Sequence, residues 1–451
     1  MQWGHKSRKR STAGLKDTRD PVTGLITYAD FVHQCANAIT TRTGDAPPGL
    51  LLIDVEGLNE AVDMDEHAAG DDLLRMVSAR IAREVPSSGV LARMNDHQFA
   101  VLFPTLTSPA VALDLAYRVV SAAATPIILA SRRQIQLSTS CGLVTWDSMS
   151  VRATVDDLLR GAGLAVREAR RGGRNHIEVC TPELISVADE TLAIGKDLRK
   201  ALDEKGLRVC YQPLVDLTHG SVVGLEALVR WTHPVHGQVS PARFVPVAEE
   251  FGLISELGRM VLSTATAQIQ QWSQTFGVPI DAHVNVSGVD LANAGFVTMV
   301  EECLSGSGLP ASRLVLEVTE TAVEPQLEVA QARFDSLHQL GVRVALDDFG
   351  TGRSALAYLQ TLAVDILKVD RSYLDAVDER RAEDLLRGVI SLGHALGMEV
   401  YGEGIEDDTQ SLRLRRNGCD IGQGYLFARP LPAEDAAAYL RRHLAPASVS
   451  S

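Results

Sequence analysis

Polar residues that could hold metal ions follow short apolar runs throughout the second half of the chain. Seven such runs, each about as long as a strand, lie between residues 222 and 427. At or near their ends stand carboxylate, amide or amine side chains: Glu226, Asn285, Glu317, Asp347, Asp348, Lys368, Glu403 and Gln423. One such residue means little, because many strands end in a polar turn. Seven runs with the same kind of ending indicate one shared site.

The residue types in this set favour metal-assisted chemistry on a phosphate ester. Hard divalent cations prefer oxygen ligands, and carboxylates gathered in one place repel each other unless cations lie between them. Two such cations can hold the attacking and leaving oxygens of a phosphoryl displacement and lower the pKa of a bridging water. Lys368 could orient that water or neutralise developing charge, and Glu403 could act as a general base or support a ligand.

The elements that would position these residues are parallel strands. Strands that are apolar on both faces and carry their chemistry at the carboxyl end are typical of a barrel of alternating strands and helices. From about residue 208 the apolar runs alternate with helical patterns, which predicts a TIM-like (β/α) barrel.

The first half has a different rhythm, and we expect an α/β sandwich there. Apolar runs at 49–55, 90–94, 99–103 and 138–146 predict strands, and amphipathic patterns at 71–85, 109–124 and 155–173 predict helices. Residues 179–206 lack strand character and have helical spacing, so they predict a connecting helix that runs into the second domain. The fold class of the whole chain is therefore α/β.

Composition narrows the class of protein. A chain of 451 residues is long enough for two domains, and its formal net charge of −14 argues against a nucleic-acid polymer as partner. Six scattered cysteines without a CxxC spacing indicate a reducing compartment, so we expect a cytoplasmic protein. No apolar run approaches the roughly 20 residues of a membrane span. Residues 1–17 are basic and predict a disordered, solvated tail.

The second half resembles the EAL domain, the cyclic di-GMP phosphodiesterase family, over roughly residues 190–445. The motifs that carry the resemblance occur in order: YQPLVDL (211–217), EALVRW (226–231), NVS (285–287), LEVTE (316–320), DDFGTGRSAL (347–356), LKVD (367–370), GEGIE (402–406) and QGYLFARP (423–430).

This resemblance implies a function and a role for each matching residue. It implies a two-metal site for Mg²⁺ or Mn²⁺ that hydrolyses cyclic di-GMP to linear pGpG, and a homodimer formed through this domain. The implied metal ligands are Glu226, Asn285, Glu317 and Asp347, with Asp348 bridging. Lys368 and Glu403 would handle the water, and Gln423 would lie in the catalytic shell, supported by Glu406. Glu320 would steady the loop after Asp348. Gln212 and Arg230 would hold the dinucleotide, although Arg230 could instead simply pair with a nearby carboxylate. The loop departs from the family at Arg353 and Ala355, where an aromatic residue and a serine are usual.

The first half resembles the GGDEF domain, the diguanylate cyclase family, over roughly residues 18–178. The motifs are DPVTGL (20–25), LIDV (52–55), HAAGD (67–71) and GRN (173–175). The signature hairpin of that family reads RxGGDEF, but this chain has Asn95 and Asp96 at the glycines and His97 and Gln98 at the two acids. Asp54 and Asp63 persist, whereas Val62 and Asn59 replace residues that read guanine and phosphate.

These replacements predict a degenerate GGDEF domain without cyclase activity. Two functions remain open for it. It could bind GTP or another nucleotide weakly and regulate the barrel, or it could be a dimerisation and packing module. The loss of the glycines and the replacements at Val62 and Asn59 together favour the second function.

Two hypotheses for the barrel belong to different classes. The first is a metal-dependent phosphodiesterase, and the alternative is a non-catalytic cyclic di-GMP receptor that signals through a protein partner. Receptor-type relatives have typically lost some of the acids, and this chain has all of them, which favours the enzyme.

Overall fold

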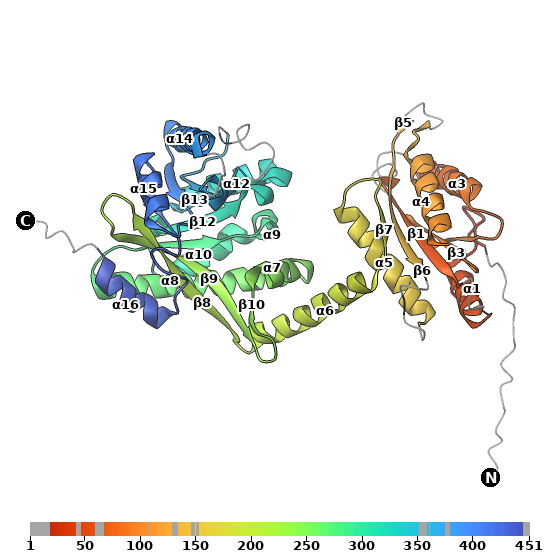
Figure 1. Cartoon of the computed structure of the whole chain (residues 1–451), viewed down its shortest axis with the longest axis horizontal. Helices are drawn as coiled ribbons and strands as arrows, with labels where there is room; N and C mark the ends of the chain where they lie inside the picture. The colour runs from red at the N-terminus through yellow and green to blue at the C-terminus, as the bar shows by residue number, and fades with distance from the viewer. Residues whose placement is uncertain are drawn as a thin grey trace, which may run out of the picture. The chain divides into compact units, whose positions relative to one another are not determined.

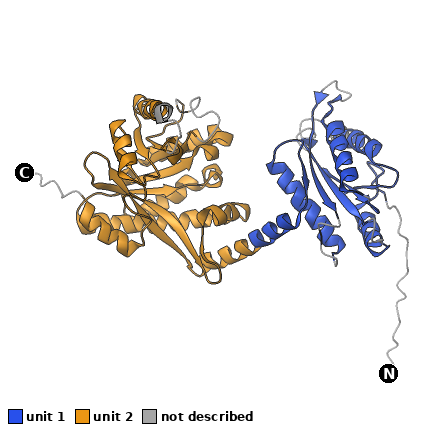
Figure 2. Ribbon diagram, in the orientation of Figure 1, with its two compact units in different colours: residues 1–192 blue, residues 193–451 orange. Residues whose placement is uncertain are grey.

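The computed structural model describes two compact units, residues 1–192 and 193–451 (Figure 2). The described residues are 19–41, 47–58, 67–106, 108–128, 134–145, 149, 153–350, 359, 361–374 and 379–444. Several predictions made above concern residues outside these ranges: the basic tail (1–17), Asn59, Val62, Asp63, Arg353 and Ala355. Each unit is taken by itself below.

The first unit is built on a five-stranded sheet in the order β2-β3-β1-β6-β7. The strands are β1 (Gly49–Glu56), β2 (Val90–Arg93), β3 (Gln98–Phe103), β6 (Ser138–Thr145) and β7 (Ile177–Val179). All neighbours in this sheet are antiparallel except β6 and β7. A two-stranded ribbon joins β4 (Ile127–Ile128) to β5 (Gln134–Ile135).

Helices cover both faces of this sheet, because its strands are apolar on both sides. Alternation along β1 sends Leu51 and Ile53 into the core beneath α3 (His67–Glu84) and α4 (Pro109–Ala124). Leu50 and Leu52 face the opposite core, which α1 (Tyr28–Thr41) and α5 (Val155–Arg171) complete. The expected α/β sandwich is confirmed (Figure 1). Helix α1 and strand β7 were not predicted.

Helix α6 (Pro182–Asp203) continues across the boundary between the units. Its first turns place Leu184 and Ile185 against the core of the first unit. Its last turns bury Leu198 and Ala201 in the second unit, beside Trp231 and Phe244.

The second unit is an eight-stranded barrel within the described part of the chain. Seven strands are parallel in sequence order: β9 (Val222–His233), β11 (Asp281–Asn285), β12 (Leu314–Thr319), β13 (Arg343–Phe349), β14 (Ile366–Val369), β15 (Glu399–Gly402) and β16 (Ile421–Gly422). Strand β8 (Leu207–Asp216) is antiparallel to both β16 and β9 and closes the ring. The TIM-like barrel is confirmed, and its one antiparallel strand was not predicted. A short strand, β10 (Gly237–Val239), pairs antiparallel with the end of β9.

Helices surround the barrel and bury the outward faces of its strands. They are α7 (Pro241–Glu250), α8 (Ile254–Phe276), α9 (Gly288–Ala292), α10 (Phe296–Ser307), α11 (Glu320–Val323), α12 (Leu327–Leu340), α14 (Glu379–Ala395), α15 (Asp408–Arg416) and α16 (Ala433–His443). No helix in the described ranges is long and apolar enough to cross a membrane. All six cysteines are buried and free.

The inside of the barrel is filled in layers, as strand alternation requires. An apolar cluster there joins residues from several strands, among them Val315, Ala345, Ile366 and Ile421. Two residues further along each of these strands stand Glu317, Asp347, Lys368 and Gln423. The two-residue alternation of side chains along the strands therefore determines both which residues fill the apolar interior of the barrel and which residues line its polar mouth.

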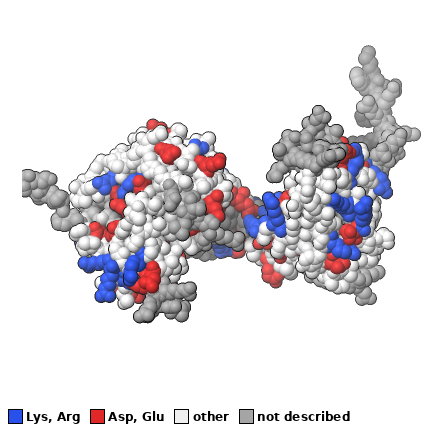
Figure 3. Space-filling view, turned by 90° about the horizontal axis from the view of Figure 1, so that it is seen from above, with Lys and Arg blue, Asp and Glu red and all other residues white. Residues whose placement is uncertain are grey.

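One face of the molecule carries charged side chains of both signs. On the face drawn in Figure 3, basic and acidic side chains are interspersed over each unit. Nucleic-acid-binding proteins instead gather lysine and arginine into one patch or stripe.

Candidate active site

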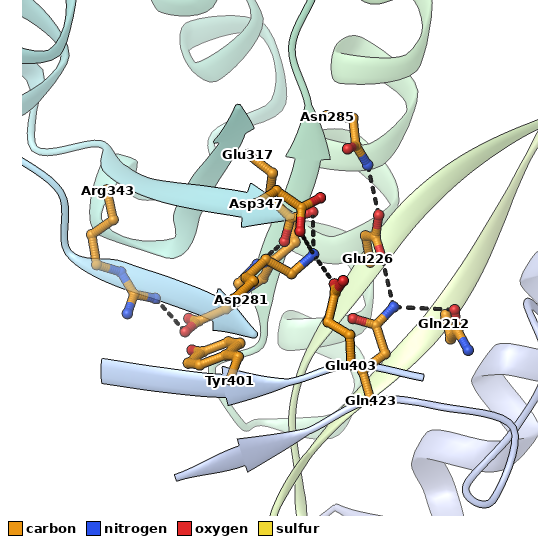
Figure 4. Close-up of polar contacts among 12 residues, drawn as sticks. Gln212, Glu226, Asp281, Asn285, Glu317, Arg343, Asp347, Tyr401, Glu403 and Gln423 are labelled. Carbon is orange, nitrogen blue, oxygen red and sulfur yellow. Dashed lines mark hydrogen bonds and ion pairs between the residues drawn. The ribbon is translucent and has the colours of Figure 1, made fainter. Parts of the chain in front are cut away.

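The carboxyl ends of the barrel strands bring the predicted polar residues together. Figure 4 shows Glu226, Asn285, Glu317, Asp347, Glu403 and Gln423 pointing toward one another from different strands. Glu226 lies in the middle of β9 rather than near its end, because this strand continues to His233 and pairs with β8 and β10. Its carboxylate still reaches the mouth, since the neighbouring strand β11 ends earlier.

Glu226 is held by amides on either side. Asn285 Nδ2 donates to Glu226 Oε1 at 2.6 Å, and Gln423 Nε2 donates to Oε2. Gln423 Nε2 also donates to Gln212 Oε1 at 3.1 Å, and Gln212 Nε2 in turn donates to the carbonyl of Ala428. Burial raises the pKa of Glu226, and the nearby Lys368 ammonium offsets part of this rise. The amide chain fixes the direction of this carboxylate.

Lys368 is the cation at the centre of the acidic residues. Its side chain is 1% exposed, and its Nζ lies 2.8 Å from Glu317 Oε2, 3.5 Å from Asp347 Oδ1 and in contact with Glu403. Burial alone would lower the pKa of Lys368, but the carboxylates of Asp347, Glu317 and Glu403 raise it well above its usual value. The lysine therefore stays charged and compensates part of the negative charge around it.

Asp347 and Asp348 both reach the mouth, although consecutive strand residues normally point to opposite sides. The pairing of β13 with β14 shifts register between Leu346 and Phe349, as in a β-bulge. Asp348 has a φ of 54°, in the left-handed region that few residues other than glycine adopt. Its backbone N–H donates to Asp347 Oδ1 at 2.9 Å. Strained backbone of this kind is typical of functional sites.

The residues present fit a divalent metal ion. Oxygen atoms of Asp347, Asp348 and Glu403 lie within 4.8 Å of one another, which is a span that one cation could bridge. Burial raises the pKa of Glu403 well above its usual value, and it raises that of Glu317 and Asp348 too. The site has several carboxylates but one lysine, Lys368, beside them. A bound cation would compensate the remaining negative charge.

The raised pKa values predict that metal-free protein loses stability as the pH rises. Glu226, Glu317 and Glu403 bind protons more readily in the folded chain than in the unfolded one, so their contribution to stability is complete below their usual pKa of 4.5. It is lost as the pH rises through their higher folded-state pKa values. We expect the melting temperature in EDTA to fall from about pH 5 to about pH 8.

Melting curves with Mg²⁺ and with Glu403→Gln provide the controls. Glu403→Gln cannot ionise at this position, so it should lose less stability than wild type over the same pH range. Saturating Mg²⁺ should also flatten the wild-type curve. Equal slopes for the two proteins in EDTA would contradict the pKa assignment of Glu403.

Two cavities flank Glu226. The smaller one, about 320 Å³, is lined by Gln212, Asp347, Glu403 and Gln423 among others. The larger one, about 980 Å³, lies between β9, α7, α8 and α11, and its lining includes Arg230, Asn285 and Asp348. The larger cavity has an apolar wall formed by residues such as Leu228, Val245 and Leu257.

Three predicted residues lie toward the edges of the site. Arg230 lines the larger cavity, and its guanidinium donates to the carbonyl of Val229 at 2.8 Å. Glu320 is fully buried, and its Oε2 accepts from the N–H of Gly350, the residue that leads into the loop after Asp348. Glu406 lines the smaller cavity and forms an ion pair with Arg371.

A buried polar group beneath the mouth was missed from the sequence. His283 is fully buried and lies 2.8 Å from Glu317, and Asp281 forms ion pairs with Arg313 and Arg343. Asp281, His283 and Asn285 occupy every second position of β11, so their side chains belong to the same face of the strand. This alternation could have indicated Asp281 and His283 once Asn285 was assigned to the site.

The hairpin of the first unit places Asn95, Asp96, His97 and Gln98 at the turn between β2 and β3. Asn95 Oδ1 accepts from the backbone N–H groups of His97 and Gln98, at 3.0 and 2.9 Å. Asp96 pairs with Arg93 at 3.3 Å, and His97 Nε2 lies 3.9 Å from Asp54. Asn95 therefore closes the turn through its side chain, which is a local use of an asparagine.

The buried carboxylate of Asp54, beside this hairpin, has a hydrogen-bond donor on one oxygen and an ion pair on the other. Gln98 Nε2 donates to Asp54 Oδ2, and Arg170 lies 2.6 Å from Asp54 Oδ1. The Asp54 side chain is 1% exposed, so these neighbours take the place of water around it. Arg170 supplies the positive charge that a metal ion would otherwise have to supply.

Gln98→Glu should destabilise the first unit by about 1–3 kcal/mol, because it removes a donor from Asp54 and adds a like charge. Chemical denaturation in EDTA measures this loss. Gln98→Met removes the donor without adding charge, so it should cost less. A Gln98→Glu protein as stable as wild type would mean that Asp54 does not depend on this contact.

The fold and the site define the class of protein: a (β/α) barrel with one antiparallel strand and an oxygen-rich, lysine-containing mouth. A family model described as "EAL domain" matches residues 196–430, and one described as "Diguanylate cyclase, GGDEF domain" matches residues 17–176. The chain belongs to the EAL domain family and carries a GGDEF domain before its EAL domain.

Named relatives share this tandem. The chain is 35% identical over 429 residues to "Cyclic di-GMP phosphodiesterase NbdA" of Pseudomonas aeruginosa, which covers 94% of this chain and 54% of that protein. It is 34% identical over 387 residues to "Bifunctional diguanylate cyclase/cyclic di-GMP phosphodiesterase MucR" of the same organism, over 85% of this chain and 56% of that one. The chain thus spans about half the length of these relatives.

Solved structures of EAL proteins resemble this chain. The structure titled "PaMucR Phosphodiesterase, c-di-GMP complex" has a TM-score of 0.52 and 36% identity, and the match covers 54% of this chain and 99% of that one. The cAMP- and cyclic-di-GMP-bound EAL enzyme Bd1971 has a TM-score of 0.55 and 26% identity over 68% of this chain and 82% of that one.

Proposed function

We propose that the second unit is a phosphodiesterase that hydrolyses cyclic di-GMP to linear pGpG with two divalent cations, Mg²⁺ or Mn²⁺. The observation that carries the proposal is the convergence of Glu226, Asn285, Glu317 and Asp347 at one barrel mouth (Figure 4). Lys368 contacts Glu317 there, and Asp348 lies beside Asp347. The names of the relatives NbdA and MucR support the choice of substrate.

The residues have distinct roles in this proposal. The metal ligands are Glu226, Asn285, Glu317, Asp347 and Asp348. Such cations, when bound, polarise a phosphodiester and lower the pKa of a coordinated water. Gln423 holds Glu226 through its amide, Lys368 Nζ stabilises negative charge beside Glu317 and Asp347, and Glu403 takes up a proton from the attacking water.

The cavities on either side of Glu226 suit a ligand with two halves. We assign the phosphates and sugars of the dinucleotide to Gln212 and Arg230, which line different cavities. The apolar wall of the larger cavity offers a surface for the flat face of a purine. Glu320 steadies the loop after Asp348, and Glu406 supports the rim near Gln423.

Incubation of the purified chain with cyclic di-GMP and Mg²⁺ or Mn²⁺ tests the function. Chromatography should detect pGpG, and Glu226→Ala, which removes one proposed ligand, should produce none. No product with either metal, despite measurable binding of cyclic di-GMP, would favour a receptor that does not turn the ligand over.

For the first unit we propose a regulatory or dimerisation role without cyclase activity. The ion pair between Asp54 and Arg170 supports this, because a carboxylate that persists from the cyclase family pattern is here paired with a protein cation. Incubation with GTP and Mg²⁺ tests the proposal, and any cyclic di-GMP formed would overturn it. Direct titration with GTP decides whether weak nucleotide binding persists.

We further propose a homodimer that forms through the EAL domain. We also propose a cytoplasmic location, and the six free cysteines support this location.

A further inference from the structure

His283 is a polar residue in a layer of the barrel that its neighbours fill with apolar side chains. Two positions before their site residues, β12, β13 and β14 carry Val315, Ala345 and Ile366. At the equivalent position before Asn285, β11 carries His283, which has no exposed surface. A buried imidazole is costly unless its polar atoms are used, so this position calls for an explanation.

The imidazole contacts one proposed metal ligand directly. His283 Nδ1 lies 2.8 Å from Glu317 Oε1, while Lys368 Nζ donates to Glu317 Oε2 at 2.8 Å. Glu317 and Lys368 are each 1% exposed. The two oxygens of this carboxylate are therefore oriented by two different donors, one from β11 and one from β14.

The surroundings determine which nitrogen carries the proton. The nitrogen that faces the Glu317 carboxylate, at hydrogen-bond distance, is Nδ1. Because a carboxylate can only accept a hydrogen bond, Nδ1 carries a proton. Nε2 has no hydrogen-bond partner among the described residues, and the ring of Tyr401 lies beside the imidazole with centroids 5.6 Å apart.

We propose that His283 is a positioning residue that orients Glu317 for metal binding by donating from Nδ1. The proposal rests on the proposed function, in which Glu317 is a ligand. Without this donor, Glu317 Oε1 would lose its hydrogen bond from His283, and the carboxylate could rotate away from the mouth. Groups that orient a metal ligand in this way typically contribute about 10–100-fold to metal affinity or activity.

The test compares two substitutions at this position in the full chain. Asparagine places its Nδ2 donor close to the position of His Nδ1, whereas leucine is of similar bulk and has no donor. We expect His283→Leu to weaken Mn²⁺ binding, measured by electron paramagnetic resonance of free Mn²⁺, by about 10–100-fold. His283→Asn should recover most of the lost affinity. A role in packing alone predicts the reverse order.

Every outcome bears on the proposal. Unchanged Mn²⁺ affinity in His283→Leu would overturn it, as would a wild-type chain that binds no Mn²⁺. If His283→Leu fails to fold, ¹⁵N spectra of the imidazoles in wild type and His283→Asn still decide, since a His283 ring without a proton on Nδ1 would overturn the proposal. A wild-type chain that binds Mn²⁺ but makes no pGpG would refute the phosphodiesterase and leave the Mn²⁺ comparison valid.

Discussion

Asp347→Asn should lower kcat for cyclic di-GMP hydrolysis by about 10³-fold, equivalent to roughly 4 kcal/mol, without unfolding the barrel. The substitution removes one negative charge from the cluster of Asp347, Asp348 and Glu403. It keeps the side-chain volume and an Oδ1 that can still accept from the N–H of Asp348. The loss should therefore fall on metal binding and on the chemistry that the metal supports.

Two measurements distinguish these effects. Initial rates of pGpG formation at increasing Mn²⁺ report whether excess metal restores part of the activity, and a melting curve reports folding. Asp335→Asn is the matched control, because Asp335 is an exposed carboxylate on α12, outside the barrel mouth. Hydrolysis by Asp347→Asn within tenfold of wild type would show that this carboxylate is not a metal ligand.

Much of the barrel could be predicted because one rule governs it. Two of the seven apolar runs, 313–320 and 343–350, correspond to β12 and β13. The polar residues at their ends lie at one mouth because the carboxyl ends of parallel strands lie on the same side of the barrel. The alternation that fills the barrel interior also sets the spacing between Val315 and Glu317.

Other features depend on contacts that strand patterns do not contain. The direction of β8 follows from closure of the ring between β16 and β9, whereas its apolar residues fit a strand of either direction. The bulge that turns Asp348 toward the mouth is a register shift against β14, which becomes visible only when both strands are placed.

The first unit shows a similar limit for pairs of distant residues. The strands and helices of the sandwich follow from periodicity, but the partner of Asp54 does not. Arg170 stands at the end of α5, more than a hundred residues away in sequence, and reaches Asp54 because α5 packs on β1 and β6. The sequence indicates that the hairpin has changed. It does not indicate which distant side chain pairs with Asp54.

Lys368→Met should destabilise the second unit of the metal-free chain by about 3–5 kcal/mol and abolish hydrolysis. Methionine keeps the length of the side chain but removes the charge that lies beside Glu317, Asp347 and Glu403. Buried carboxylates without a counter-charge must either take up protons or unfold the site. Denaturation in EDTA, followed by the fluorescence of the buried Trp231 and Trp272, measures the change.

Three further measurements decide whether charge compensation is the cause. Saturating Mg²⁺ should recover more stability in Lys368→Met than in wild type, because a bound cation supplies the missing charge. Adding Glu403→Gln to Lys368→Met should recover stability as well, since it removes one of the uncompensated carboxylates. Lys200→Met, which removes an exposed lysine of α6, should change stability by less than about 1 kcal/mol. If Lys368→Met were as stable as wild type in EDTA, the carboxylates at the mouth would be holding protons of their own, and Lys368 would not be their counter-ion.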